Sequence, residues 1–501
     1  MTDYPNPLIP GFNPDPSVVR VDGVYYLATS TFEYVPGIPI YRSTDFANWE
    51  HVANVATDIS QIGVEEVITG GGVWAPTIRN HDGLFHLIVT IAMGRGCVVY
   101  TATDPAGEWS QGTLIEGIEG IDPDLAWDED GTAIVTYSGL VTVGPDAGLH
   151  TGIRQSRVDL VAGRTLEAPR SLWAGSGFKF PEAPHLYRRS DWWYLMIAEG
   201  GTERGHGVSI ARSASPYGPF DPNPANPFLS ARSTNRPIQN TGHGDLVEAP
   251  DGSTAIVLLG VRPRGATQAF SALGRETFVS SIEWVDGWPV AEPVILRPRE
   301  ESLDYRIDFA EAAELDLGWM AVRRNPATVA TITDGALAVV ADGTTMDDHR
   351  PAFLGRRQLT QTAAFSTEID TASGSGGLTV RYDELTHYDL EARATAEGVV
   401  VTARAAVPGI RQEWSAVLPA GAVTLHLDSE PTPISFSAEA MTSDFVVFRA
   451  RSGDTEVTLA RVDGRYLSAE TAASFTGRVA GVYAVAGTPR FGWFAFAGSN
   501  D

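Results

Sequence analysis

The chain has 501 residues, of which 43% are hydrophobic and 20% are charged, and 62 acidic side chains against 36 basic ones give a net charge of −26. A soluble chain of this length is too long to fold around a single hydrophobic core, so at least two domains are expected. The acidic field repels nucleic-acid phosphates and anionic membrane surfaces, which excludes these partners and favours a neutral substrate.

Cysteine content and the N-terminal segment bear on the cellular compartment. Cys97 is the only cysteine, so an intrachain disulfide is excluded, and the thiol is interpreted as a small packing residue. The first residues contain no basic segment followed by an apolar one, and no apolar run is long enough to span a membrane. A cytoplasmic protein without a signal peptide is therefore predicted.

A turn followed by an apolar or aromatic run recurs five times before residue 290. The turns are Asp22-Gly23, Asp82-Gly83, Asp130-Gly131, Asp191-Trp192 and Asp251-Gly252, at steps of 60, 48, 61 and 60 residues. Seven to nine residues before each turn stands a residue of functional type, in order Asp15, Trp74, Asp122, Glu182 and His243. A period of this size is typical of propellers and similar arrays.

Each repeat contains the signals of four strands, because a third strand, a turn and an aromatic residue follow the hairpin, as in 43–49 and 101–109. Five such units predict a five-bladed β-propeller over residues 1–297. The innermost strands line the axis, so their equivalent positions converge at one end of the channel. The spacing therefore predicts one axial site that includes three carboxylates.

The pattern changes in the second half of the chain. The repeat ends near Trp288, and the charged, proline-containing stretch 297–301 is interpreted as a linker. Residues 304–501 still contain short strands without the period, which favours an antiparallel, concanavalin-like β-sandwich. One short helix is expected at 309–314. The predicted fold class is thus all-β, a five-bladed propeller followed by a sandwich.

Three carboxylates at one axial site, Asp15, Asp122 and Glu182, suit glycoside hydrolysis. One carboxylic acid protonates the leaving oxygen, and one carboxylate activates water or attacks carbon. Close packing of acids raises the pKa of at least one of them, which keeps it protonated near neutral pH. Sugar C–H faces stack on aromatic rings, so Trp74 and Phe32 are candidate walls. The alternative is a chance coincidence in a chain with 62 acidic residues.

Six segments carry a family resemblance: 13–17, 71–76, 121–125, 181–187, 241–244 and 273–277. In this order they resemble glycoside hydrolase family 43, from about Asn6 to Val294 and more weakly to the C-terminus. The resemblance implies inversion, with Asp15 as general base, Glu182 as general acid, and Asp122 orienting the acid and tuning its pKa. Inversion requires the base and acid to lie roughly 6.5–9.5 Å apart, whereas about 5 Å would favour retention.

The resemblance leaves two interpretations of His243: a contact to a calcium ion or water in the propeller channel, or a hydrogen bond to the catalytic carboxylates. The sequence has no calcium loop with acids at alternating spacing. No cofactor is therefore required, and a structural Ca²⁺ would involve His243. Arg275 is expected to bind a sugar hydroxyl or a carboxylate in the site rather than a surface acid.

Two departures from the family pattern and one further resemblance affect the site. Asp124 faces the same way as Asp122 in an extended strand, so either could tune the acid, with Asp122 favoured by the motif. The loop 93–96 is short where relatives that cleave xylobiose have an insertion, which would open the site to branched or longer substrates. Phe475 lies in a segment that resembles the sandwich part of the pocket rim, and its alternative is a place in the sandwich core.

The resemblance implies an exo-acting glycosidase that removes terminal β-D-xylosyl or α-L-arabinofuranosyl units from imported xylo- or arabinoxylo-oligosaccharides, with β-xylosidase activity slightly favoured. One alternative is an α-L-arabinofuranosidase acting on branched arabinoxylan or arabinan oligosaccharides. Two others are a non-catalytic carbohydrate-binding propeller and a propeller for protein interaction, which would need no convergent acids. A homo-oligomer is compatible with the sequence.

Overall fold

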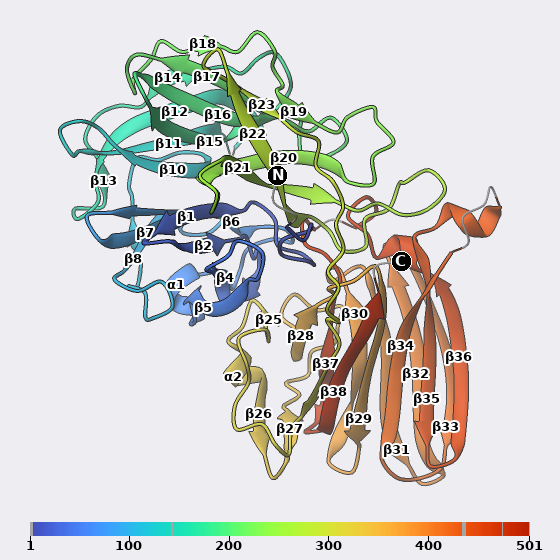
Figure 1. Ribbon diagram of the computed structural model, residues 1–501. Helices are drawn as coiled ribbons and strands as arrows, with labels where there is room; N and C mark the ends of the chain where they lie inside the picture. Colours follow the sequence, from blue (N-terminus) through green and yellow to red (C-terminus); the bar gives the residue numbers. More distant parts are fainter. Residues whose placement is uncertain (1–3, 142–143, 433–436, 473, 500–501) are drawn as a thin grey trace.

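The computed structural model describes residues 4–141, 144–432, 437–472 and 474–499, and these residues form two bodies built from strands (Figure 1). Among these residues helix is confined to short segments: α1 (Ile59–Ile62), α2 (Pro326–Val329) and the 3₁₀ segments η1 (Ala438–Met441) and η2 (Gly464–Tyr466). In the described part of the chain, no helix has the length and apolar character needed to cross a membrane. The all-β prediction is confirmed.

The N-terminal body consists of five antiparallel sheets in chain order. The first two sheets contain β1 (Ser17–Val21), β2 (Val24–Ala28), β4 (Gly37–Ser43) and β5 (Glu50–Ala56), then β6 (Gly72–His81), β7 (Leu84–Ala92), β8 (Gly96–Ala102) and β9 (Thr113–Leu114). The third contains β10 (Ile121–Trp127), β11 (Ala133–Leu140), β12 (His150–Asp159), β13 (Arg164–Thr165) and β14 (Arg170–Trp173).

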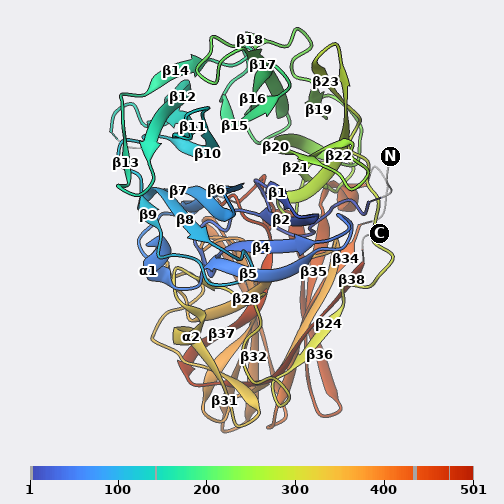
Figure 2. The ribbon, with the colours of Figure 1, turned by 60° about the vertical axis from the view of Figure 1, so that its left-hand side comes forward.

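The last two sheets follow the same plan. The fourth contains β15 (Glu182–Arg189), β16 (Trp192–Glu199), β17 (Gly207–Ser213), β18 (Asp221–Pro222) and β19 (Leu229–Ser230). The fifth contains β20 (Gln239–Glu248), β21 (Thr254–Val261), β22 (Glu276–Val285) and β23 (Trp288–Ala291). The first strands of successive sheets contact one another, and β20 contacts β1, so the sheets are the blades of a closed propeller (Figure 2).

The N-terminal segment helps to close the ring. Asn6 forms a bridge with Arg297, and the Asn6 side chain exchanges two hydrogen bonds with the backbone of Val279 in the fifth blade. The amide therefore acts like one more residue of a strand, because it both donates to and accepts from the backbone of the same residue. This contact joins the start of the chain to its last blade.

Two of the recurring Asp-Gly pairs form two-residue hairpins, Asp22-Gly23 between β1 and β2 and Asp82-Gly83 between β6 and β7, whereas the pairs in the third and fifth blades lie in longer loops. Asp22 has φ 49° and Gly23 has φ 82°, and Val21 pairs directly with Val24. Two residues with positive φ give the turn that matches the twist of flanking strands, and glycine adopts it without a Cβ penalty. In the fourth blade Arg189 pairs with Trp192, so the turn there consists of Ser190 and Asp191.

The C-terminal body contains two sheets packed face to face. One sheet has the order β26 (Ala330–Thr333), β27 (Ala336–Val339), β38 (Arg490–Ser499), β29 (Thr362–Asp370), β34 (Val423–Pro431), β35 (Asp444–Ser452) and β36 (Thr455–Asp463), with β24 (Tyr305–Asp308) on β38. The other has the order β28 (Phe353–Arg357), β37 (Val479–Gly487), β30 (Gly374–Arg381), β31 (His387–Thr395), β32 (Gly398–Val407) and β33 (Ile410–Leu418). Buried side chains of both, including Phe365, Leu390 and Phe494, form one core.

The helix expected at 309–314 is wrong. Only a turn follows β24, in which the Asp308 carbonyl accepts hydrogen bonds from the amides of Glu311 and Ala312. Nucleating a helix is costly, and six residues form too few hydrogen bonds to repay that cost. The buried ring of Phe309 packs into the sandwich core instead.

The two bodies meet along strands and loops near the propeller axis. β3 (Tyr34–Val35) from the first blade pairs with β25 (Ala321–Val322) from the second body. Gly274 has φ 69°, and a Cβ there would lie 2.3 Å from the carbonyl oxygen of Thr476. This close approach brings the segment with Phe475 against the open end of the propeller.

Candidate active site

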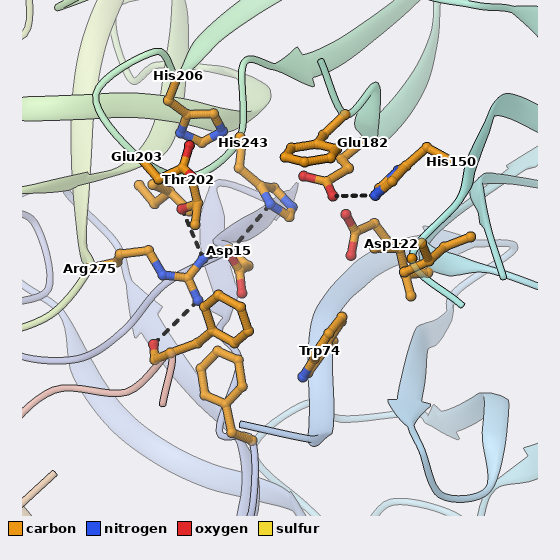
Figure 3. Close-up of a pocket in the computed structure, with 18 residues that line it drawn as sticks. Asp15, Trp74, Asp122, His150, Glu182, Thr202, Glu203, His206, His243 and Arg275 are labelled. Carbon is orange, nitrogen blue, oxygen red and sulfur yellow. Dashed lines mark hydrogen bonds and ion pairs between the residues drawn. The ribbon is translucent and has the colours of Figure 1, made fainter. Parts of the chain in front are cut away.

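A cavity of about 370 Å³ opens at one end of the propeller axis. Its lining includes all eight residues that the sequence placed in the site: Asp15, Phe32, Trp74, Asp122, Glu182, His243, Arg275 and Phe475. Figure 3 shows Asp122 and Glu182 on one side and Arg275 on the other, with Asp15 and His243 between them. Its size is in the range of cavities that enclose small ligands.

A local backbone feature at each blade directs these side chains to the axis. Asp15, Ala75, Asp122, Ala183 and His243 all have φ between 47° and 55°. In blades two to five the register of the first two strands shifts at or beside this residue, as between Glu182 and His185. A bulge bends its strand and redirects a side chain.

The position of these bulges corrects the alignment of the five repeats that the sequence suggested. The repeating positive-φ position carries Asp15, Asp122 and His243 in three blades, but Ala75 and Ala183 in the other two. Trp74 and Glu182 therefore each lie one residue before the equivalent place. The general acid candidate reaches the cavity from a different direction than the other two carboxylates, because successive side chains in a strand point to opposite sides.

Asp15 lies at the buried end of the cavity with three polar partners. Ser30 Oγ donates to its Oδ2 at 2.6 Å, Arg275 Nη1 lies 3.0 Å from Oδ1, and His243 Nδ1 lies 3.3 Å from Oδ1. Burial alone would raise the pKa of Asp15, but Arg275, His243 and Ser30 outweigh it and hold this pKa below its usual value. Asp15 is therefore a carboxylate at neutral pH.

The pKa values of Asp122 and Glu182 are shifted upward, in the direction opposite to that of Asp15. Burial and then the negative charge of Asp15 raise the pKa of Asp122, whose Oδ2 accepts a hydrogen bond from the Ala183 amide at 3.1 Å. Burial and then the charges of Asp122 and Asp15 raise the pKa of Glu182. Like charges confined together cannot all ionise, so this group retains a proton at neutral pH. The site thus combines a carboxylate base with a carboxylic acid.

Aromatic rings and a guanidinium form the walls. The Phe32 and Phe475 rings stack with centroids 6.1 Å apart, and Trp74 meets Phe475 edge-on at 5.8 Å. Arg275 Cζ lies 5.5 Å from the Phe32 ring centroid, and its Nη2 donates to the Phe475 carbonyl at 3.3 Å. Phe475 therefore lies at the cavity rim, with 42% of its surface exposed, and not in the sandwich core. Arg275 binds a carboxylate of the site rather than a surface acid.

Asp124 has a different position from Asp122. Its side chain is fully buried and pairs with the Arg79 guanidinium at 2.8 Å, below the cavity. Asp122, which lines the cavity, is therefore the residue near Glu182. Cys97 is buried in the second blade, and burial raises its pKa, as expected for a packing residue.

The residues around His243 do not fit a calcium ion. Calcium takes six to eight oxygen ligands, whereas the carboxylate beside His243 is Asp15, which also pairs with the Arg275 cation. Across the described ranges, no group of three or more His, Cys, Asp and Glu side chains is placed to hold a metal. Burial lowers the pKa of His243, so its ring is neutral and contacts the candidate base.

The structure also adds residues that the sequence did not indicate. Thr202, His206, Phe180 and His150 line the same cavity. Thr202 Oγ1 accepts a hydrogen bond from Arg275 at 3.3 Å, and a Cβ on Gly242 would lie 2.4 Å from the His206 ring. These residues lie in loops or away from the repeated position, so the period gave no signal for them.

The fold and site define a propeller glycoside hydrolase, and comparisons identify its family. The model of glycosyl hydrolases family 43 matches residues 4–289, and the beta-xylosidase C-terminal concanavalin A-like domain matches residues 306–497. The chain belongs to glycoside hydrolase family 43.

The relatives of this chain carry two kinds of activity name. A non-reducing end alpha-L-arabinofuranosidase of Bacteroides ovatus is 34% identical over 96% of this chain and 91% of the relative. A xylosidase/arabinosidase of Butyrivibrio fibrisolvens is 37% identical over 59% and 58% of the two chains. Among solved structures, a GH43B of the Bacteroides ovatus xyloglucan locus has a TM-score of 0.87 at 31% identity, with 99% of each chain covered. A xylan beta-1,4-xylosidase of Bacillus halodurans has a TM-score of 0.86 at 26% identity, covering 99% and 100%.

The pH dependence of kcat/KM is expected to be a broad bell. Activity is expected to fall at low pH as Asp15, the candidate base, gains a proton and at high pH as Glu182, the candidate acid, loses one. Because the pKa of Glu182 is raised, the alkaline limb lies well above 4.5, its ordinary value. Asp122→Asn removes a negative charge that favours the protonated acid, so this limb should move down by about one pH unit. An alkaline limb that stays in place in the variant would contradict this coupling.

Phe475→Ala is expected to lower kcat/KM about tenfold or more, because a contact of a large apolar side chain at the rim is lost. The measurement is steady-state hydrolysis of a disaccharide substrate. Tyr466→Ala is the matched control, since Tyr466 is an equally exposed aromatic residue of the same body and lies outside the cavity lining. Equal losses in the two variants would rule out a rim function for Phe475.

Proposed function

We propose that the protein removes single terminal β-D-xylosyl or α-L-arabinofuranosyl units from oligosaccharides with inversion of configuration. The observation that carries this proposal is the opposite protonation of two carboxyl groups in one cavity. The pKa of Asp15 is lowered by Arg275 and His243 against the effect of burial, while the pKa of Glu182 is raised by burial and by neighbouring carboxylates. A carboxylate and a carboxylic acid on separate residues suit glycoside hydrolysis, and the match to glycosyl hydrolases family 43 favours their use in single displacement.

In this mechanism Asp15 takes a proton from a water molecule as the water oxygen bonds to the anomeric carbon. Glu182 gives its proton to the glycosidic oxygen as the bond between that oxygen and the anomeric carbon breaks. The products are a pentose of inverted configuration and a shortened oligosaccharide. Arg275 and His243 keep Asp15 ionised and oriented, and Asp122 holds the backbone beside Glu182 through the Ala183 amide.

The shape of the cavity supports exo action. Asp15, His243 and Arg275 are each less than a tenth exposed and form its buried end, while Phe475 from the second body stands at the rim. A chain end can enter such a cavity, whereas the middle of a polysaccharide would need a groove open at both ends. The residues of the short loop 93–96 do not line the cavity, which leaves that side without the insertion expected in xylobiose-cleaving relatives.

A second candidate is an enzyme selective for α-L-arabinofuranosyl units on branched oligosaccharides. The observation that favours it is the name of the Bacteroides ovatus relative, a non-reducing end alpha-L-arabinofuranosidase that matches along nearly the whole chain. Relatives named xylosidase/arabinosidase favour dual activity instead.

The test is parallel assay of the nitrophenyl β-D-xyloside and α-L-arabinofuranoside, with NMR of the first sugar released. Both substrates are expected to be cleaved, and the new anomer should have the configuration opposite to the substrate. Retention would overturn inversion, and release of disaccharides from a xylo-oligosaccharide would overturn exo action. Cleavage of the arabinofuranoside alone would establish the second candidate.

A further inference from the structure

The mouth of the cavity differs from its buried end. The Glu182 side chain is 23% exposed, which is more than the buried Asp15 and less than Phe180, which is 37% exposed. Glu182 must lie beside the scissile oxygen to protonate it. The terminal sugar therefore occupies the buried end, and the leaving sugar occupies the mouth beyond Glu182.

His150 stands beside Glu182 at this boundary (Figure 3). Its Nε2 lies 3.5 Å from Glu182 Oε1, and its ring packs on the Phe180 ring with centroids 4.9 Å apart. His150 comes from β12 in the third blade, whereas Phe180 and Glu182 begin the fourth blade. The contact thus joins two blades at the point where the proton is transferred.

The other ring nitrogen of His150 indicates which nitrogen carries the proton. Nδ1 is buried and has no hydrogen-bond partner among the residues that the structure describes. A buried N–H without an acceptor is rarer in proteins than an unpaired acceptor, so the proton belongs on Nε2, facing Glu182. Burial also lowers the pKa of His150, which keeps the ring neutral. His150 is therefore a neutral ring whose N–H lies on the side of the acid.

Neighbouring side chains hold Phe180 in place at the cavity mouth. Lys179 Nζ lies 4.9 Å from the centroid of its ring and is itself fixed by Glu203 at 2.8 Å. Gly201 has φ 74°, and a Cβ there would lie 3.0 Å from Phe180 Cδ2, so glycine leaves room for the ring. An exposed, supported aromatic ring at the cavity mouth suits the C–H face of a sugar.

We infer that His150 and Phe180 form the subsite for the leaving sugar and that His150 is a positioning residue for Glu182. Phe180 stacks on the second sugar of the oligosaccharide. His150 Nε2–H donates to the Glu182 carboxylate as this group loses its proton to the glycosidic oxygen, which stabilises the charge that forms on Glu182. This inference rests on the proposed role of Glu182 as general acid.

The His150 test compares leaving groups. His150→Phe keeps an aromatic ring against Phe180 but removes the donor, and His150→Gln keeps a donor. A hydrogen bond to a charged group supports about a tenfold effect or more. In His150→Phe, kcat/KM for xylobiose or an arabinosyl xylo-oligosaccharide should fall at least about tenfold further than kcat/KM for a dinitrophenyl pentoside, which needs little protonation.

His150→Gln is expected to recover part of that difference. A steeper dependence of log kcat on the pKa of the leaving phenol in His150→Phe supports the same conclusion. Equal losses of kcat/KM on all substrates would show that His150 has only a structural role. Unchanged kcat/KM on every substrate would show that His150 has no role in the mechanism.

The Phe180 test compares a substrate with a second sugar and one without. Phe180→Ala should raise the KM ratio of xylobiose to methyl β-D-xyloside about tenfold. Phe178→Ala is the matched control, because Phe178 has nearly the same exposure, lies two residues away and is outside the cavity lining. An unchanged ratio in Phe180→Ala, or an equal change in Phe178→Ala, overturns the subsite.

Failure of this inference and failure of the proposed function give different results. If the enzyme does not cleave pentosides, the wild-type protein is inactive on every substrate of the series. If only the leaving-sugar subsite is wrong, the wild-type protein is active and the variants fail to distinguish leaving groups.

Discussion

Glu182→Gln is expected to lower kcat for xylobiose or an arabinosyl xylo-oligosaccharide about 10²- to 10⁴-fold, the range that general acid catalysis contributes. Gln keeps the size and polarity of the side chain but has no acidic proton. Loss of kcat should be much smaller for a dinitrophenyl pentoside, because its leaving group departs without protonation. The alkaline limb of the pH profile should disappear, since it reports the ionisation of Glu182.

Glu203→Gln is the matched control for this experiment. Glu203 lines the same cavity and also contributes to the raised pKa of Glu182, but it pairs with Lys179 at its exposed end. Its replacement should change kcat far less than Glu182→Gln on every substrate. An unaltered kcat for the oligosaccharide in Glu182→Gln would sink the assignment of this residue as the acid, as would equal losses on activated and unactivated leaving groups.

The repeat in the sequence predicted the convergence of the site but misaligned it by one residue. Asp15, Asp122 and His243 share the positive-φ position, whereas in the second and fourth blades Ala75 and Ala183 occupy it. The dipeptides at this position are Asp15-Pro16, Ala75-Pro76, Asp122-Pro123, Ala183-Pro184 and His243-Gly244. Aligning these pairs, rather than the residues of functional type, gives the correct register.

Other parts of the site could not be predicted because they depend on tertiary contacts. His150 reaches Glu182 from a neighbouring blade, and no period in the sequence relates the two. Phe475 was predicted only by resemblance, since its approach to the cavity depends on the close contact between Gly274 and Thr476. The helix predicted at 309–314 rested on a composition of Ala and Glu that favours helix. The segment forms a turn instead, because it is short and its Phe309 ring is buried in the sandwich core.

The corrected register also explains the layer beneath the cavity. Two residues after each positive-φ position stand Ser17, Thr77, Asp124, His185 and Asp245. Successive alternate residues of a strand point the same way, so these side chains form a second ring on the axis. Arg79 enters this ring from the second blade, with Nη2 2.8 Å from Asp124 and Nη1 2.8 Å from Asp245.

Arg79→Met is therefore expected to destabilise the protein by about 3–5 kcal/mol, the usual cost of removing one partner of a buried ion pair. Met keeps much of the side-chain volume, but two fully buried carboxylates, Asp124 and Asp245, lose their shared cation. The measurement is the midpoint of thermal or urea unfolding at pH 7. Arg42→Met is the control, because the pair of Arg42 with Glu50 is exposed and such pairs contribute about 0–1 kcal/mol.

The pH dependence of the stability lost in Arg79→Met distinguishes a charge effect from a packing effect. In the wild-type protein burial opposes ionisation of Asp245, but Arg79 holds the pKa of Asp245 well below its usual value. The ionised Asp245 therefore stabilises the fold at pH values above its pKa in the unfolded chain, and this stabilisation is lost as the pH falls through its pKa in the folded protein. Without Arg79, burial raises the pKa of this carboxyl, and protonation at lower pH relieves the uncompensated charge. The deficit of Arg79→Met should therefore shrink between pH 7 and pH 5, whereas a deficit caused by lost packing would stay constant across that range.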